Sequence, residues 1–251
     1  MQNRIIVVNS KTEVKPQFMS KENNKIYFSN SPFTNGHKVI DFVWSARLDE
    51  NFDLWMDLHL ESDNYDQEEE YKDDLDEIDD ISQENVTKQL WINYDHAIIS
   101  STYWNNKGIK IENNEQLDFN QLNNKVFEID PLPINLDEPE KLAFGVSMLG
   151  NDTVAQHEIT FLDTEEFGVF DIKWKGKIAN THLGETDFDY DFYVYMKNIK
   201  FNGIKVHPSL EKNKVVEFFT SQLAHYNDFE LVDTDELELE NYILKLRKQE
   251  D

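Results

Sequence analysis

The sequence predicts a β-rich α+β fold in which two related antiparallel-sheet halves are followed by a C-terminal helical region. The first observation is composition, because the 251 residues include 17 Phe, 10 Tyr and 5 Trp, and aromatic side chains suit pleated sheets. The second is that apolar and polar residues alternate along most of the chain. The third is that the period becomes helical only near the end. Together they favour sheets over helices for most of the chain.

Alternation predicts the individual strands. Residues 38–48 and 52–60 are separated by Asp49, Glu50 and Asn51, a spacing typical of a β-hairpin. In the second of these strands the apolar residues share one face, while Trp55, Asp57 and His59 share the other. The same pattern predicts strands at residues 89–101, 107–112, 125–130, 142–149, 157–162, 168–178 and 189–204.

The C-terminal region departs from the strand pattern. Val215, Phe219 and Leu223 share one face of a helix predicted over residues 209–226, which Pro208 and Ser209 open. Residues 236–248 fit either a second helix or a strand, and the pattern does not decide between them.

Prolines separate the two predicted halves. Residues 130–139 contain Pro131, Pro133 and Pro139, which favour an extended connection over regular structure. The sequence therefore predicts an N-terminal β-rich half over residues 1–132 and a C-terminal β-rich half over residues 139–251.

An internal correspondence links these halves. Residues 40–48 (IDFVWSARL) align with residues 170–178 (FDIKWKGKI), so that Trp44 matches Trp174. The strands that follow, residues 52–58 and 190–196, also match, but the second copy has a longer turn. We interpret this as two copies of one hairpin unit, although the alternation of amphipathic strands alone produces such matches.

Charge is the strongest functional signal. The chain has 50 Asp and Glu residues against 24 Lys and Arg residues, a formal charge of −26. Such a field repels the phosphates of nucleic acids and anionic lipids, and it accelerates encounters with basic proteins. We therefore expect a basic protein partner, with neither nucleic acid nor membrane as a partner. The same charge is also consistent with a role in solubility alone.

Residues 61–84 concentrate this charge, with 13 acids and one lysine. Tyr71, Leu75, Ile78 and Ile81 are spaced by four, three and three residues, which predicts a docked helix with an acidic outer surface. A solvated loop is the alternative, because like charges four residues apart oppose a helix. The carboxylates predicted to bind the partner are Glu69, Glu70, Asp73, Asp74, Asp76, Glu77, Asp79 and Asp80.

The common motifs of catalysis and cofactor binding are missing from the sequence. There is no Cys, no histidine pair at metal-ligand spacing, no glycine-rich phosphate loop and no nucleophile elbow. The sequence therefore predicts no catalytic residues, no metal site and no cofactor. The sequons at Asn85 and at Asn151-Asp152-Thr153 are read as chance matches, because no signal peptide is recognised and the chain is expected to be cytoplasmic.

Two alternative functions remain open at this point. Asp163 with Asp171 and Lys173 resembles the carboxylate and lysine arrangement of metal-dependent hydrolases. Trp55, Trp104 and Tyr193 are candidates for the sugar-stacking surface of a carbohydrate-binding module.

A family resemblance adds to this reading. Residues 166–178 (EFGVFDIKWKGKI) carry a Phe-Gly pair, a Trp and a Gly, followed by an acidic turn and an amphipathic strand. This passage resembles small β-rich bacterial domains of unassigned function, some of which are thought to be immunity proteins encoded beside polymorphic toxins. The resemblance implies a non-enzymatic binding protein, such as an immunity protein that occludes a basic toxin in the cytoplasm.

Overall fold

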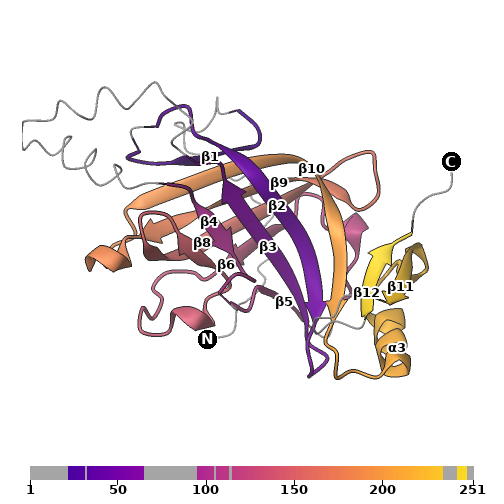
Figure 1. The fold of residues 1–251 in the computed structure, drawn as a ribbon. Coiled ribbons are helices and arrows are strands. Elements are labelled where there is room, and N and C mark those ends of the chain that lie inside the picture. Colours follow the sequence, from indigo (N-terminus) through magenta and orange to yellow (C-terminus); the bar gives the residue numbers. More distant parts are fainter. Residues whose placement is uncertain are drawn as a thin grey trace, which may run out of the picture.

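The computed structural model describes residues 22–31, 33–64, 95–104, 106–112, 115–233 and 242–247, and it shows a β-sheet closed into a barrel (Figure 1). The strands are β1 (Lys25–Phe28), β2 (His37–Leu48), β3 (Leu54–Ser62), β4 (Ile98–Ser100), β5 (Ile109–Ile111), β6 (Val126–Ile129), β7 (Gly145–Ser147), β8 (Asn151–Asp163), β9 (Val169–Ala179), β10 (Tyr190–Val206), β11 (Phe229–Asp233) and β12 (Tyr242–Leu246). The predicted β-rich fold is confirmed.

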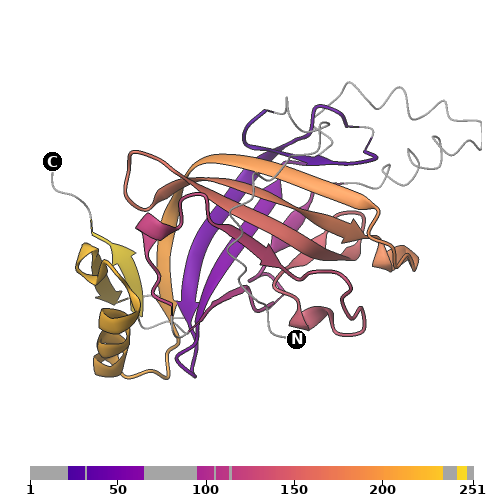
Figure 2. The same ribbon diagram turned by 180° about the vertical axis from the view of Figure 1, so that it is seen from behind.

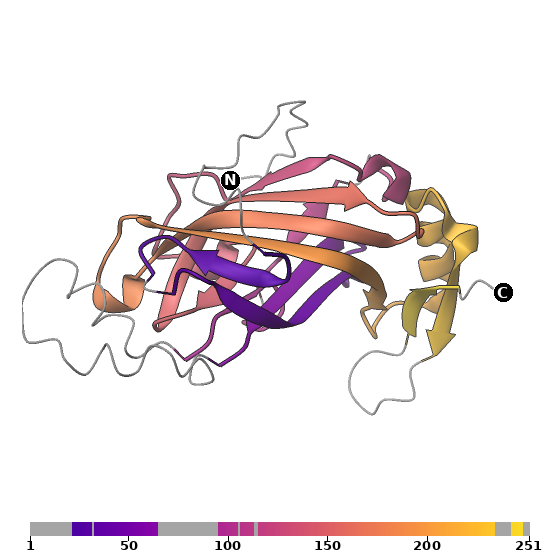
Figure 3. The same ribbon diagram turned by 90° about the horizontal axis from the view of Figure 1, so that it is seen from above.

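The way the sheet closes is set by strand direction. The strands β2, β3, β4, β7, β8, β9 and β10 pair in that order, each antiparallel to the one before. After seven alternating strands, β10 must run parallel to β2, and the two pair along Phe201–Val206 and Trp44–Leu48. At the other end of this seam β1 inserts as an eighth strand, antiparallel to both β2 and β10 (Figure 3).

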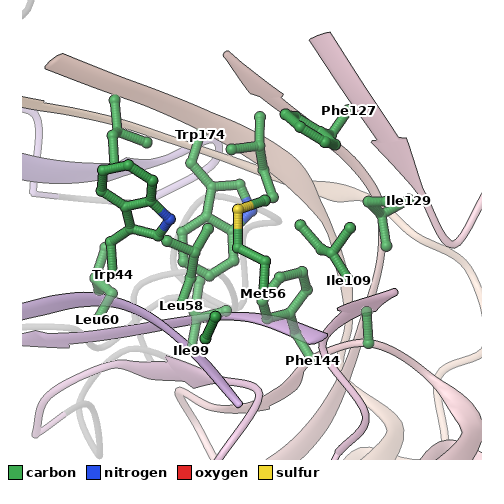
Figure 4. Packing of buried hydrophobic residues seen from close by; sticks show 14 of the residues in the cluster. Trp44, Met56, Leu58, Leu60, Ile99, Ile109, Phe127, Ile129, Phe144 and Trp174 are labelled. Carbon is green, nitrogen blue, oxygen red and sulfur yellow. The ribbon is translucent and has the colours of Figure 1, made fainter. Parts of the chain in front are cut away.

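The interior of the barrel is filled by large side chains. Trp44 and Trp174 are fully buried, and Figure 4 shows both among Met56, Leu58 and Phe144. The Trp44 ring centroid lies 5.0 Å from that of Phe161 and 4.8 Å from that of Phe201. Barrels of about eight strands have an interior that such side chains can fill, and this one is packed as a core.

The two matching hairpins lie side by side in this barrel. Both tryptophans are buried in the interior, but their pairings differ: Trp44 lies opposite Leu58, and Trp174 lies opposite Val194. Val194 aligns with Met56, so the longer turn of the second hairpin shifts its register by two residues. A shift of two keeps every side chain on its face. Strands from both sides of the proline-rich connection therefore pair in one sheet.

One end of the barrel is covered by the C-terminal region (Figure 2). The predicted helix is confirmed as α3 (Lys212–Gln222), and residues 242–246 form the strand β12, which pairs with the end of β10. The ring of Phe52 packs against Phe218 of α3, with centroids 5.7 Å apart. Phe52 has a positive φ of 61° and belongs to the hairpin loop, so β3 begins at Leu54.

The opposite end carries two loops with short 3-10 helices, η5 (Pro139–Lys141) between β6 and β7 and η6 (Thr181–Leu183) between β9 and β10. Figure 1 shows η6 at the far end from α3. Among the described residues, no helix has the length and apolar character that crossing a membrane requires.

Two histidines are buried in the protein without charge. The Nδ1 atom of His157 accepts a hydrogen bond of 3.1 Å from the Trp174 indole, and Gly176 lies so close that a Cβ there would be 2.8 Å from Nδ1. Burial lowers the pKa of His157 to about 3. Burial, with the charge of Lys25, lowers the pKa of His37 to about 4.

These shifts predict acid destabilisation. The folded pKa lies below the unfolded value of about 6.5, so the unfolded chain binds more protons and the free energy of unfolding falls as the pH drops below that value. For His157 the loss between pH 7 and pH 5 is about 2 kcal/mol. His157→Asn keeps an acceptor for Trp174 but does not titrate, so its stability should fall about 2 kcal/mol less over the same range. Urea unfolding followed by tryptophan fluorescence measures this.

The control is His96→Asn, which removes a histidine from the surface outside the barrel. If the His157→Asn and unmodified chains lose the same stability between the two pH values, the neutral buried histidine is not the source of the pH dependence.

Candidate functional site

The acidic residues predicted to bind the partner, from Glu69 to Asp80, all lie outside the described residues, and so does the predicted helix that carries them. The chain leaves the described part at Asn64, after β3, and returns at Asp95, before β4. The excess of acid is not confined to that segment. The described residues include 32 Asp and Glu against 17 Lys and Arg.

The carboxylates of the hydrolase alternative are not brought together. On the paired strands β8 and β9, Asp171 lies opposite Leu162 and Asp163 lies opposite Phe170. Neighbouring residues on a strand point to opposite faces, so Asp163 and Asp171 lie on different faces of the sheet. No group of three or more possible metal-ligating side chains occurs among the described residues.

Asp171 instead holds a bulge in β10. Its carboxylate accepts hydrogen bonds from the Lys197 ammonium at 2.6 Å, the Asn198 N–H at 2.9 Å and the Tyr195 hydroxyl at 3.0 Å. Burial alone would raise the pKa of Asp171, but these donors hold it below its usual range. Asn198 has a positive φ of 55° at the register shift, so we assign Asp171 a structural role.

The three aromatic residues proposed for sugar binding are also dispersed. Tyr193 is buried beside Tyr27 on the outer wall. The indole of Trp55 donates a hydrogen bond to Asp49, and the Arg47 and Lys110 cations lie over its ring. Trp104 lines a cavity at the end of the barrel that carries η6. The three rings do not form one stacking platform.

A polar cavity of about 680 Å³ lies on the outer wall over β2 and β3. It is built around the ion pair between Arg47 and the buried Asp57, whose carboxylate also accepts a hydrogen bond of 2.7 Å from the Ser101 hydroxyl. Arg47 further donates to the backbone carbonyl of Lys107 at 2.5 Å. Burial raises the pKa of Asp57, and Arg47 and Ser101 offset that rise only in part.

This cluster fixes the loop between β4 and β5. Gly108 follows with a positive φ of 70°, and a Cβ there would lie 2.6 Å from the Asp57 carboxylate. The side chain of Asn106 donates hydrogen bonds to the carbonyls of Leu142 at 3.0 Å and Pro139 at 3.2 Å. The polar groups of the outer wall thus hold loops in place. Through Asn106 they also position one wall of a second cavity, described next.

The second cavity, which we call the acidic cavity, has a volume of about 490 Å³ and lies between the η5 loop, the η6 loop, β7 and the start of β8. Its apolar wall consists of Trp104, Leu136, Pro139, Leu142, Phe144, Val146 and Val154. Its charged residues are Glu140, Asp152 and Glu185, and no Lys or Arg is among its described lining residues.

Asp152 is the buried carboxylate of this cavity. Its side chain is 0% exposed, and its Oδ1 atom lies 2.5 Å from Nδ1 of His182. The other oxygen, Oδ2, is buried and has no hydrogen-bond partner among the described residues. A ligand that donates a hydrogen bond here would satisfy a group that is otherwise costly to bury.

The sequence did not identify this site. In the sequence Asp152 is only the middle residue of the sequon Asn151-Asp152-Thr153, and an isolated Asp at the start of a strand carries no recognisable pattern. His182 and Glu185 lie in a loop 30 or more residues away in sequence, and only the pairing of β8 with β9 brings them to Asp152.

The chain has no match among known family models, curated proteins or solved structures.

The Arg47–Asp57 pair gives a prediction about stability. Arg47→Met should lower the free energy of unfolding at pH 7 by about 3 kcal/mol, because it leaves a buried carboxylate without its ion-pair partner. Adding Asp57→Asn should recover part of this loss by removing the stranded charge. Urea unfolding of the single and double variants measures both effects.

Lys110→Met is the matched control. It breaks the 2.7 Å ion pair of Lys110 with Asp53. Because Asp53 is more exposed than Asp57, this change should lower the free energy of unfolding by less than about 1 kcal/mol. An Arg47→Met loss no larger than that of the control would contradict the assigned role of the pair.

Proposed function

We propose that this chain is a non-enzymatic acidic protein that binds a basic protein, and that the acidic cavity is part of its binding surface. The observation that carries this is the lining of the cavity, in which three carboxylates occur without a Lys or Arg among the described residues. Such a site favours cations, and it disfavours nucleic acids and other polyanions.

The position of the acidic segment supports the same surface. Ser62 at the end of β3 pairs with Val39 near the start of β2, so the chain leaves the described part at the end of the barrel that carries η6. It returns before β4, which pairs directly with β7 in the wall of the cavity. The chain therefore leaves the described part, before the predicted partner-binding carboxylates from Glu69 to Asp80, at the same end as the acidic cavity.

An immunity protein that blocks a basic toxin in the cytoplasm is the specific form of this proposal. It combines the acidic binding surface with the resemblance of residues 166–178 to bacterial domains thought to have that role. A protein of this kind works by occupying a surface of its target, so it needs no catalytic residues of its own.

The experiment is to purify the complex with a basic partner and measure its association rate constant at different ionic strengths. The protein encoded by the neighbouring gene is tested first. We expect a one-to-one complex whose association slows by about tenfold or more between about 0.05 M and 0.5 M salt. An association rate constant that is independent of salt would contradict charge-driven binding.

A pair of variants locates the surface. The first replaces the eight predicted partner-binding carboxylates with the corresponding amides and should slow association at low salt. The control neutralises eight exposed carboxylates near the α3 end: Asp163, Glu165, Glu166, Glu211, Glu217, Asp228, Glu230 and Asp233. Because both variants change the net charge equally, an equal effect would show that net charge, and not a defined surface, guides the partner.

A further inference from the structure

The strongest unexplained feature of the structure is the free oxygen of Asp152. Asp152 lines the acidic cavity, but its side chain is 0% exposed, and Oδ2 is buried without a hydrogen-bond partner among the described residues. Its other oxygen is already held by His182. A buried carboxylate oxygen without a donor costs free energy, and a charged donor from outside would remove this cost while forming a strong hydrogen bond.

The surroundings of Asp152 define the chemistry of that donor. Glu140 and Glu185 add negative charge, and both are exposed at the rim. Lys141, although next to Glu140, is paired with Glu138. The cavity therefore attracts a cation, and its described lining contains no Lys or Arg that would compete for the place.

The opposite wall suits the body of such a ligand. Trp104 packs so closely on the backbone that a Cβ at Gly145 would lie 2.7 Å from its ring, and Phe144 is buried in the same wall. Aromatic faces attract cations, and a planar guanidinium also stacks on them. A volume of about 490 Å³ is ample for one long side chain with part of its backbone.

We propose that the acidic cavity is the anchor site for an arginine side chain of the basic partner. The guanidinium stacks on Trp104 within the negative surroundings of Glu140 and Glu185. Because the Asp152 side chain is fully buried, binding requires that it turn towards the cavity, where Oδ2 accepts a hydrogen bond from the guanidinium. This inference rests on the proposed function and makes it more specific, because it assigns short-range binding to one buried carboxylate. Arginine is favoured over lysine because its guanidinium is planar and more weakly hydrated.

The test uses N-acetyl-arginine amide as the probe and N-acetyl-citrulline amide as its uncharged isostere. Binding is followed by NMR at the indole N–H of Trp104, which is assigned with a Trp104→Phe variant. We expect saturable binding of the arginine probe and at least about tenfold weaker binding of the citrulline probe. Equal binding of the two probes would overturn the proposal.

Three variants separate the buried carboxylate from general charge. Asp152→Asn should raise the dissociation constant of the arginine probe at least about tenfold. The control is Asp137→Asn, because Asp137 is exposed in the η5 loop and does not line the cavity. It should change this dissociation constant less than about twofold. If Asp152→Asn fails to fold, Glu140→Lys combined with Glu185→Lys places cations at the rim and should abolish binding. Unchanged binding in the folded variants would overturn the proposal.

The complex with the partner distinguishes this inference from the proposed function. Asp152→Asn should raise the dissociation rate constant at least about fivefold and leave the salt dependence of association intact. If the association rate constant depends on salt but Asp152→Asn leaves the dissociation rate constant unchanged, the partner does not bind in the cavity. In that case the inference fails and the proposed function stands. If the arginine probe binds through Asp152 but no basic protein associates, the proposed function fails, and the cavity takes a free organic cation.

Discussion

The closure of the sheet between β10 and β2 is the constraint on which the rest of the structure depends. Seven alternating strands bring the last one back parallel to the first, and the short strand β1 completes the antiparallel circuit at one end only. Because the barrel is closed, its aromatic side chains can fill a single interior. The two tryptophan hairpins meet at this seam, which explains why both contribute to one core.

Closure also makes the two ends of the barrel different. At one end β10 continues past β9 and pairs with β12, and η4 (Phe119–Gln121) inserts Phe119 beside Trp44 and Phe201, so that end is covered. At the other end the loops with η5 and η6 diverge and leave the acidic cavity between them. The proposed binding surface therefore lies where the barrel core ends and the connecting loops begin.

Local patterns were sufficient to predict most strands and the helix, because the alternation that marks them reflects which face is buried. They could not predict the parallel seam, because Phe201 and Trp44 lie more than 150 residues apart and nothing local records their pairing. The same limit applies to the site. The carboxylates predicted from the sequence stand out because many of them cluster within residues 61–84. Asp152 is distinguished only by its burial and by the missing hydrogen-bond partner of Oδ2, which are properties of the folded chain.

In the proposed complex, exposed and buried carboxylates would have separate roles within one surface. Exposed carboxylates act over about a Debye length, so they guide an approaching cation but contribute little once salt screens them. A buried carboxylate acts only at contact, where the low dielectric strengthens its interaction and makes an unmet hydrogen bond costly. A basic partner drawn in by the first would be retained by the second. The barrel holds Asp152 at the start of β8, in a cavity that the exposed carboxylates of Glu140 and Glu185 also line. In the proposed complex, guidance and retention would therefore occur at the same end of the molecule.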